Sequence, residues 1–193
     1  AQNDMKRILS FHIVSQIGYM VLGLGLFTVS GIAGAVFFIV HQIPVKTSLF
    51  LVSGLVEESA GSTALDRVGG LLRRTPLTAA LFGLAALSLA GIPPFSGFIG
   101  KLSLVEAGFG AQEYAIVAVS LVGSLLTLFS MAKIWNGVFW GVADRPTRAV
   151  ADGATRLRAP ILMTGSTIVL VGLTVDIGSL LQPSAYVDAV LGR

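Results

Sequence analysis

The sequence predicts an all-α transmembrane protein whose helices cross the bilayer several times. Apolar residues make up 54% of the 193 residues and charged residues only 12%, whereas soluble domains carry about a quarter charged residues. The mean hydropathy is +0.84. A membrane-spanning helix needs about 20 predominantly apolar residues. We therefore expect a single membrane domain over 1–193 with about six helices, in the runs 8–27, 33–56, 77–92, 95–109, 114–140 and 160–181.

Helix caps and charged stretches set the bounds of the first runs. Asn3 and Asp4 are suitable N-caps for a helix that begins near Lys6. Residues 57–76 contain both acids and arginines, and we expect this stretch to be the first loop at the membrane surface. The second loop is expected at 141–159, before the closing helix at 160–181.

The third and fourth runs meet at a helix break. Pro93-Pro94 cannot continue the helical hydrogen-bond ladder, and the following run, 95–109, is short and rich in glycine. Broken helices inside a membrane are tolerated where the backbone lines a cavity, and they often carry transport sites. We therefore expect a short membrane helix that is broken at these prolines.

The fifth run ends with Lys133, Trp135 and Trp140, residue types that anchor helices at the membrane interface. With six crossings, Lys133 falls on the opposite side of the membrane from Lys6 and Arg7. The basic residues are then divided too evenly for the positive-inside rule to set the orientation.

The composition excludes several classes of site. The chain has no cysteine, which excludes disulfides, thiolate metal sites and iron–sulfur clusters. The net charge is +3, but the basic residues stand mostly at helix ends and in short loops. We therefore expect no nucleic-acid binding, no metal site and no cofactor.

The first helix carries a polar stripe. His12, Ser15, Gln16 and Tyr19 are spaced i, i+3, i+4 and i+7, which places them on one face. Such a face contacts another helix or a hydrated path, because ionisable groups in lipid are costly. His12 suits proton relay because imidazole titrates near neutral pH, whereas hydrogen bonding between helices is an equally good reading for Ser15 and Tyr19.

The second helix places His41, Gln42 and Lys46 near the middle of the membrane, with Pro44 among them. Gln42 and Lys46 share a face at i, i+4. A lysine so far from either helix end cannot easily extend its ammonium group to the interface. We expect Lys46 to exchange a proton; a structural ion pair is the alternative.

Lys101 follows directly after the break in the sequence 91–101, Gly-Ile-Pro-Pro-Phe-Ser-Gly-Phe-Ile-Gly-Lys, and is the first candidate for a functional charge. Glu106 stands five residues later and points about 140° away on an ideal helix. It is a second candidate on this segment, or the hydrated end of the helix.

Three stretches resemble a known family: residues 3–7 with 15–19, residues 46–51, and residues 90–101. They are similar to the antiporter-like membrane subunits, which include Mrp-type Na⁺/H⁺ antiporter subunits and the proton-pumping subunits of respiratory complex I. The resemblance is specific over residues 3–109. The lysine at position 101 and the stretch Ser10–Gln16 are most similar to the D-type subunits of the Mrp group.

The resemblance implies two inverted repeats of five helices, each with a broken helix, of which this chain would supply the second repeat and the closing helix. It places the charge of the second broken helix on Lys101, the lysine of the preceding path on Lys46, and the neighbouring histidine on His41. Many members have this histidine four residues before the lysine; here the interval is five, and Gln42 occupies the other position.

The function implied is that of a proton-translocating subunit of a multisubunit Na⁺/H⁺ antiporter in the cell membrane, a secondary transporter and not an enzyme. Its expected partners are H⁺ and Na⁺, lipid, the other subunits and a missing N-terminal half, because the start at Ala1 reads as the middle of a longer protein or one piece of a split gene. Two alternatives remain: a proton-pumping subunit of a complex I-like or hydrogenase-type redox complex, and a structural scaffold subunit.

Overall fold

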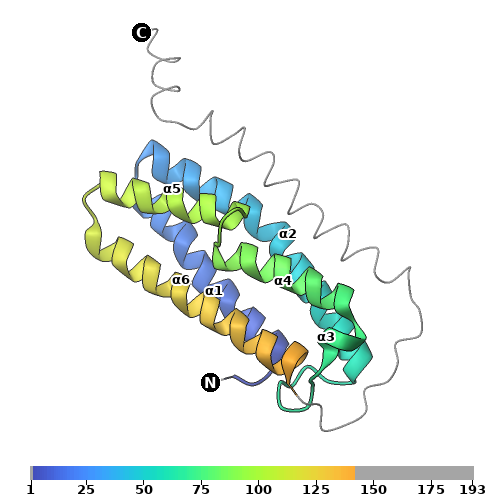
Figure 1. Ribbon diagram of the computed structural model, residues 1–193. Coiled ribbons are helices and arrows are strands. Elements are labelled where there is room, and N and C mark those ends of the chain that lie inside the picture. The colour runs from blue at the N-terminus through green and yellow to red at the C-terminus, as the bar shows by residue number, and fades with distance from the viewer. Residues whose placement is uncertain (1, 142–193) are drawn as a thin grey trace.

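The computed structural model describes residues 2–141, which form a helical bundle (Figure 1). The expected loop from 142 onward and the closing run 160–181 lie outside the described residues. The helical membrane fold is confirmed for the rest, and three helices are long and apolar enough to cross a membrane there. The helices are α1 (Met5–Gly25), α2 (Val29–Ala60), α3 (Leu71–Arg74), α4 (Pro76–Ala90), α5 (Ser96–Gly110) and α6 (Tyr114–Trp135), with a π-helical turn over Asn136–Trp140.

α4 and α5 together follow the length of α2. Each has 15 residues, about 22 Å of helix, which is shorter than the roughly 30 Å hydrocarbon core. α5 packs on the N-terminal half of α2, where Gly100 meets Phe37 and Phe38, and α4 packs on the C-terminal half (Figure 1). The runs 77–92 and 95–109 therefore share one passage through the bundle.

This shared passage changes where α6 ends. α6 returns to the end of the bundle that holds the N-terminus, and Lys133 Nζ donates to the Gln2 carbonyl at 2.7 Å and to Asn3 Oδ1 at 2.9 Å. The expectation that Lys133 stands on the opposite side from Lys6 is therefore wrong. It counted α4 and α5 as separate crossings.

The break between α4 and α5 begins at a glycine. α4 ends at Ala90 because Gly91 adopts φ = 83°, a left-handed conformation suited to a helix C-cap, so the helix stops before Pro93-Pro94. α5 begins at Ser96. Gly97 then packs so closely on α4 that a Cβ there would overlap the Ser88 carbonyl oxygen, which fixes the two half-helices against each other.

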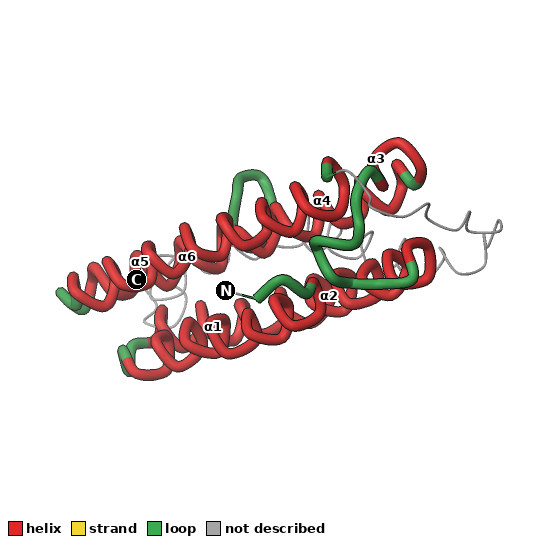
Figure 2. The backbone as a smooth tube through the Cα atoms, turned by 90° about the horizontal axis from the view of Figure 1, so that it is seen from below, coloured by secondary structure: helices red, strands yellow, loops and turns green. Residues whose placement is uncertain are grey.

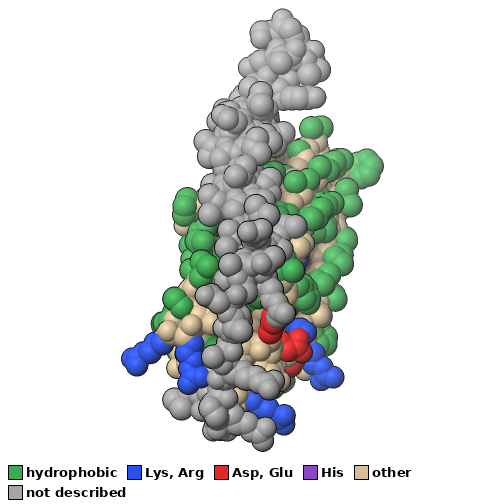
Figure 3. All heavy atoms as spheres, turned by 90° about the vertical axis from the view of Figure 1, so that its right-hand side faces the viewer, with side chains coloured by type: hydrophobic (Ala, Val, Ile, Leu, Met, Phe, Trp, Pro, Cys, Tyr) green, Lys and Arg blue, Asp and Glu red, His purple; other side chains and the backbone are tan. Residues whose placement is uncertain are grey.

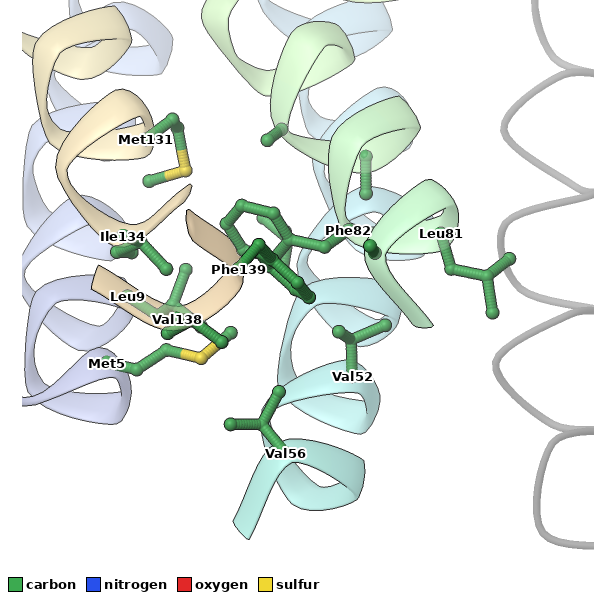
Figure 4. Packing of buried hydrophobic residues seen from close by; sticks show 14 of the residues in the cluster. Met5, Leu9, Val52, Val56, Leu81, Phe82, Met131, Ile134, Val138 and Phe139 are labelled. Carbon is green, nitrogen blue, oxygen red and sulfur yellow. The ribbon is translucent and has the colours of Figure 1, made fainter. Parts of the chain in front are cut away.

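The bundle has two layers, with α1 and α2 in one and α4, α5 and α6 in the other (Figure 2). Near the N-terminal end the layers close on an apolar core (Figure 4). At its centre the rings of Phe82 and Phe139 lie 5.3 Å apart, and those of Trp135 and Phe139 4.9 Å apart. This core closes one end of the bundle.

On the face that Figure 3 shows, the charged side chains gather at this same end, below a body of apolar side chains. Lys6 and Glu57 form an exposed ion pair at 2.5 Å. Beside it the Met5 amide donates to the Thr63 carbonyl at 2.9 Å, and the Leu65 amide donates to the Asn3 carbonyl at 2.8 Å. The first loop is thus tied to the start of α1.

Asp4 caps α1 and should contribute measurably to stability. Its Oδ1 accepts from the Arg7 amide at 3.0 Å, and its Oδ2 accepts from the Thr63 hydroxyl at 2.5 Å. Asp4→Ala should lower the free energy of unfolding by about 1 kcal/mol, whereas Asp4→Asn retains most of the cap. Thermal unfolding in detergent measures both; equal loss in the two variants would contradict the capping role.

The same carboxylate gives a pH dependence. The hydrogen bond from Thr63, assisted by the Arg7 amide, holds the pKa of Asp4 below its usual value of 3.8. A lowered folded-state pKa means that this contribution is present above pH 3.8 and is lost as the pH falls through the folded value. Asp4→Ala should therefore flatten this acid limb of the stability curve.

Gly97→Ala should destabilise the bundle because the added methyl meets backbone, which cannot move aside as a flexible side chain can. Overpacking typically costs about 1–3 kcal/mol. Gly110→Ala in the same helix is the matched control, because its Cβ has no neighbour within 4 Å. Thermal unfolding of both variants is the measurement. A melting temperature for Gly97→Ala as high as that of the control would show that the two half-helices are not held by this contact.

Candidate functional site

Lys101 lies inside the bundle at the break between the half-helices. Its side chain is only 7% exposed, and Nζ donates to the carbonyls of Ala90 at 2.8 Å and Leu89 at 3.2 Å. The last carbonyls of a helix have no partner within the helix and carry its negative dipole end. The ammonium group of Lys101, on α5, therefore supplies hydrogen bonds to the C-terminal carbonyls of α4.

Tyr19 connects Lys101 to α6. The Lys101 ammonium stands 5.4 Å from the centre of the Tyr19 ring, within the range of a cation–π interaction. The Tyr19 hydroxyl donates to the Ser120 carbonyl and contacts Ser124 Oγ at 2.7 Å. Tyr19 belongs to the predicted polar face of the first helix but not to the predicted site residues. Its i+7 spacing from His12 is the sequence signal that indicates its place beside them.

His41 joins α2 to the start of α5. Its Nδ1 forms a hydrogen bond with Ser96 Oγ at 2.8 Å, and both side chains are buried. Its Nε2 has no partner among the described residues. Ser96, the first residue of α5, was also absent from the predicted site, although it lies in the stretch that predicted the break.

A pair of glutamines crosses the bundle beside these groups. Gln42 on α2 donates to Gln16 Oε1 on α1 at 3.2 Å, and Gln16 donates to Thr127 Oγ1 on α6 at 3.4 Å. Gln42 Oε1 is buried without a hydrogen-bond partner in the described part of the chain. The glutamines thus extend the polar interior from Tyr19 toward Lys46.

Lys46 lies one turn after Gln42 on α2. Its Nζ is buried and makes no hydrogen bond to any described residue. His12, whose Nδ1 is also buried without a described partner, lies within electrostatic range of both Lys46 and Lys101. Over residues 2–141 neither lysine forms an ion pair, so the structural ion pair considered for Lys46 is not found there.

The predicted site residues therefore fall into two sets. Lys101, Lys46, His41, His12, Gln42 and Gln16 share the interior, whereas Ser15 and Glu106 occupy exposed positions. Ser15 lines grooves between α1 and α6, and Glu106 stands on the outside of α5. Within the described ranges no group of His, Asp and Glu could hold a metal ion. What the interior offers chemically is a set of proton-binding and hydrogen-bonding groups.

Residues 1–127 match the family described as "NADH:quinone oxidoreductase/Mrp antiporter, TM". The chain is 42% identical to the D component of the Na⁺/H⁺ antiporter of Alkalihalophilus pseudofirmus, over 99% of its own length and 41% of that protein. It thus spans about two fifths of this relative.

Two solved structures have the same fold. In the Mrp complex from Dietzia sp. DQ12-45-1b, one chain matches with a TM-score of 0.74 and 32% identity, covering 99% of this chain and 45% of that one. Respiratory complex I from Thermus thermophilus contains a match with a TM-score of 0.79 and 21% identity, over 88% and 36%; at that identity the likeness concerns the fold alone.

These matches and the apolar helices of the bundle establish a multi-pass protein of the cell membrane. The match over residues 1–127 covers α1, α2, the broken α4–α5 passage and most of α6, which include the elements that carry the two interior lysines. The chain belongs to the NADH:quinone oxidoreductase/Mrp antiporter transmembrane family.

Proposed function

We propose that the chain is part of a proton-translocating subunit of a multisubunit Na⁺/H⁺ antiporter, a secondary transporter and not an enzyme. The observation that carries the proposal is Lys101, a buried lysine bonded to the broken end of α4. The antiporter assignment is supported by the A. pseudofirmus relative, which is named as a component of a Na⁺/H⁺ antiporter.

Burying the ammonium groups of two lysines costs free energy, which indicates that they have a function. Charged groups inside a bilayer are rare and mark ion pathways and proton relays by default. Lys101 has partners that stabilise its charge, namely the α4 carbonyls and the Tyr19 ring. Lys46 has none among the described residues, so the two ammonium groups stand in different surroundings.

The polar groups between the lysines support a relay. His12 interacts electrostatically with both, and Gln16 and Gln42 are hydrogen-bonded to each other across α1 and α2. Because like charges repel in a medium of low dielectric constant, a proton on one lysine weakens proton binding at the other. A membrane potential of 100 mV contributes about 2.3 kcal/mol for each charge moved across the membrane.

The proposal includes partner subunits. The outer faces of α1, α2 and α6 carry large exposed apolar side chains, among them Val14, Val29 and Leu125, which lipid or neighbouring membrane helices must cover. The Mrp complex from Dietzia sp. contains a chain of the same fold. We propose that the present chain also acts with other subunits of a membrane complex.

Lys101→Ala should abolish Na⁺-dependent proton movement, because it removes the proton-binding group and leaves the α4 carbonyls unpaired. The measurement is a pH-sensitive dye in inverted vesicles that contain the intact complex, with co-purification of the subunits as the check on assembly. Lys6→Ala is the control: it removes a lysine from an exposed ion pair, a change typically worth less than about 1 kcal/mol, and should leave transport intact.

Each alternative has its own outcome in the same vesicles. Unchanged antiport in Lys101→Ala, and in the double variant Lys46→Met with Lys101→Met, would favour a scaffold role. Absence of any Na⁺ response in the unmodified complex, with proton pumping on addition of a respiratory donor, would favour a redox-driven pump.

A further inference from the structure

A groove between α1 and α6 runs from the charged end of the bundle to the buried polar interior. Its volume is about 360 Å³, and the polar residues along it are Gln2, His12, Ser15, Thr127, Ser130 and Lys133. Water occupies about 30 Å³ per molecule in the liquid, so the groove can hold on the order of ten molecules. We refer to it below as the α1–α6 groove.

The groove reaches deep into the membrane-spanning part. Its mouth lies at Lys133 and Gln2, which are hydrogen-bonded to each other at the charged end. His12 and Ser15 stand seven and ten positions after Met5, the first residue of α1, which places them about 10 Å and 15 Å along the helix at 1.5 Å per residue. Ser15 is therefore near half the depth of a roughly 30 Å hydrocarbon core.

The inner wall of the groove is continuous with the lysine cluster. Thr127 lines the groove and accepts the hydrogen bond of Gln16, which in turn accepts from Gln42. His12 lines it too, yet its Nδ1 is buried without a partner among the described residues. This imidazole therefore stands between the groove and the interior, within electrostatic range of Lys46.

We propose that the α1–α6 groove is a water-filled side inlet through which protons reach Lys46 by way of His12. This inference rests on the proposed function and names the route to the same site. Water fits the groove better than an acyl chain does, because an acyl chain would leave the imidazole of His12 and the hydroxyl of Ser15 against hydrocarbon at membrane depth.

Cysteine accessibility tests the inlet directly. The chain has no cysteine, so one substitution gives it a single thiol. Charged methanethiosulfonates react with the thiolate, which forms in water and not in an apolar environment. Ser130→Cys samples the mouth and Ser15→Cys the deep wall. Val14→Cys and Leu125→Cys are the controls, at positions 70% and 66% exposed on the outer faces of α1 and α6 and outside the groove.

The intact complex in vesicles is labelled with the ammonium-bearing reagent, and the mass shift of this chain gives the rate. Both groove cysteines should react at least about tenfold faster than both controls, as expected of thiols in water. Modification of Ser15→Cys should then reduce Na⁺-dependent proton movement, whereas exposure of Val14→Cys to the reagent should not. The rate is read from the chain itself, so failure of the antiporter proposal leaves it unaffected.

Two results would overturn the inlet. Slow labelling at both groove positions, equal to that of the controls, would show that lipid or a partner helix fills the groove. Fast labelling at Ser130→Cys with slow labelling at Ser15→Cys would show that water stops before it reaches His12.

Discussion

A helix that stops inside a bilayer leaves its last carbonyls without water, and the interior of this bundle at the break meets that constraint. α4 ends at Ala90, capped by Gly91, in mid-passage, and its carbonyls at Leu89 and Ala90 accept hydrogen bonds from the ammonium group of Lys101. Unsatisfied backbone groups in hydrocarbon cost several kcal/mol each. The lysine that marks the site is therefore also the group that makes the break tolerable, and structure and proposed transport depend on the same two hydrogen bonds.

The remaining polar groups are placed by side-chain contacts between helices. His41 meets Ser96 at the start of α5, Gln42 meets Gln16, and Tyr19 meets α6. Between membrane helices such contacts supply part of the association energy, since burial from water does not drive helices together within lipid. The apolar core near the charged end, with Phe82 and Phe139 at its centre, holds the helices in register so that these contacts can form.

The sequence predicted the helices and the break well because each has a local cause. Long apolar runs, the Asp4 cap and the glycine- and proline-rich stretch are all readable without tertiary information. Lys46 and Lys101 were recognisable as charges within apolar runs. Tyr19 and Ser96 were not, because their roles depend on which helix packs beside them. The side of Lys133 was wrong because run lengths do not tell whether two short helices make one crossing or two. The proton-path roles of these residues stay a prediction.

Tyr19 has a further consequence. Its ring lies beside the Lys101 ammonium, and its hydroxyl is hydrogen-bonded to the α6 backbone at Ser120. The charge on the lysine and the position of α6 are therefore energetically coupled. By thermodynamic reciprocity, whatever factor protonation of Lys101 applies to the affinity of a neighbour seated on α6, that neighbour applies to the proton affinity of Lys101. A protein bound to α6 thus changes the proton affinity of Lys101 without contacting it, and Tyr19 is the residue that couples the two.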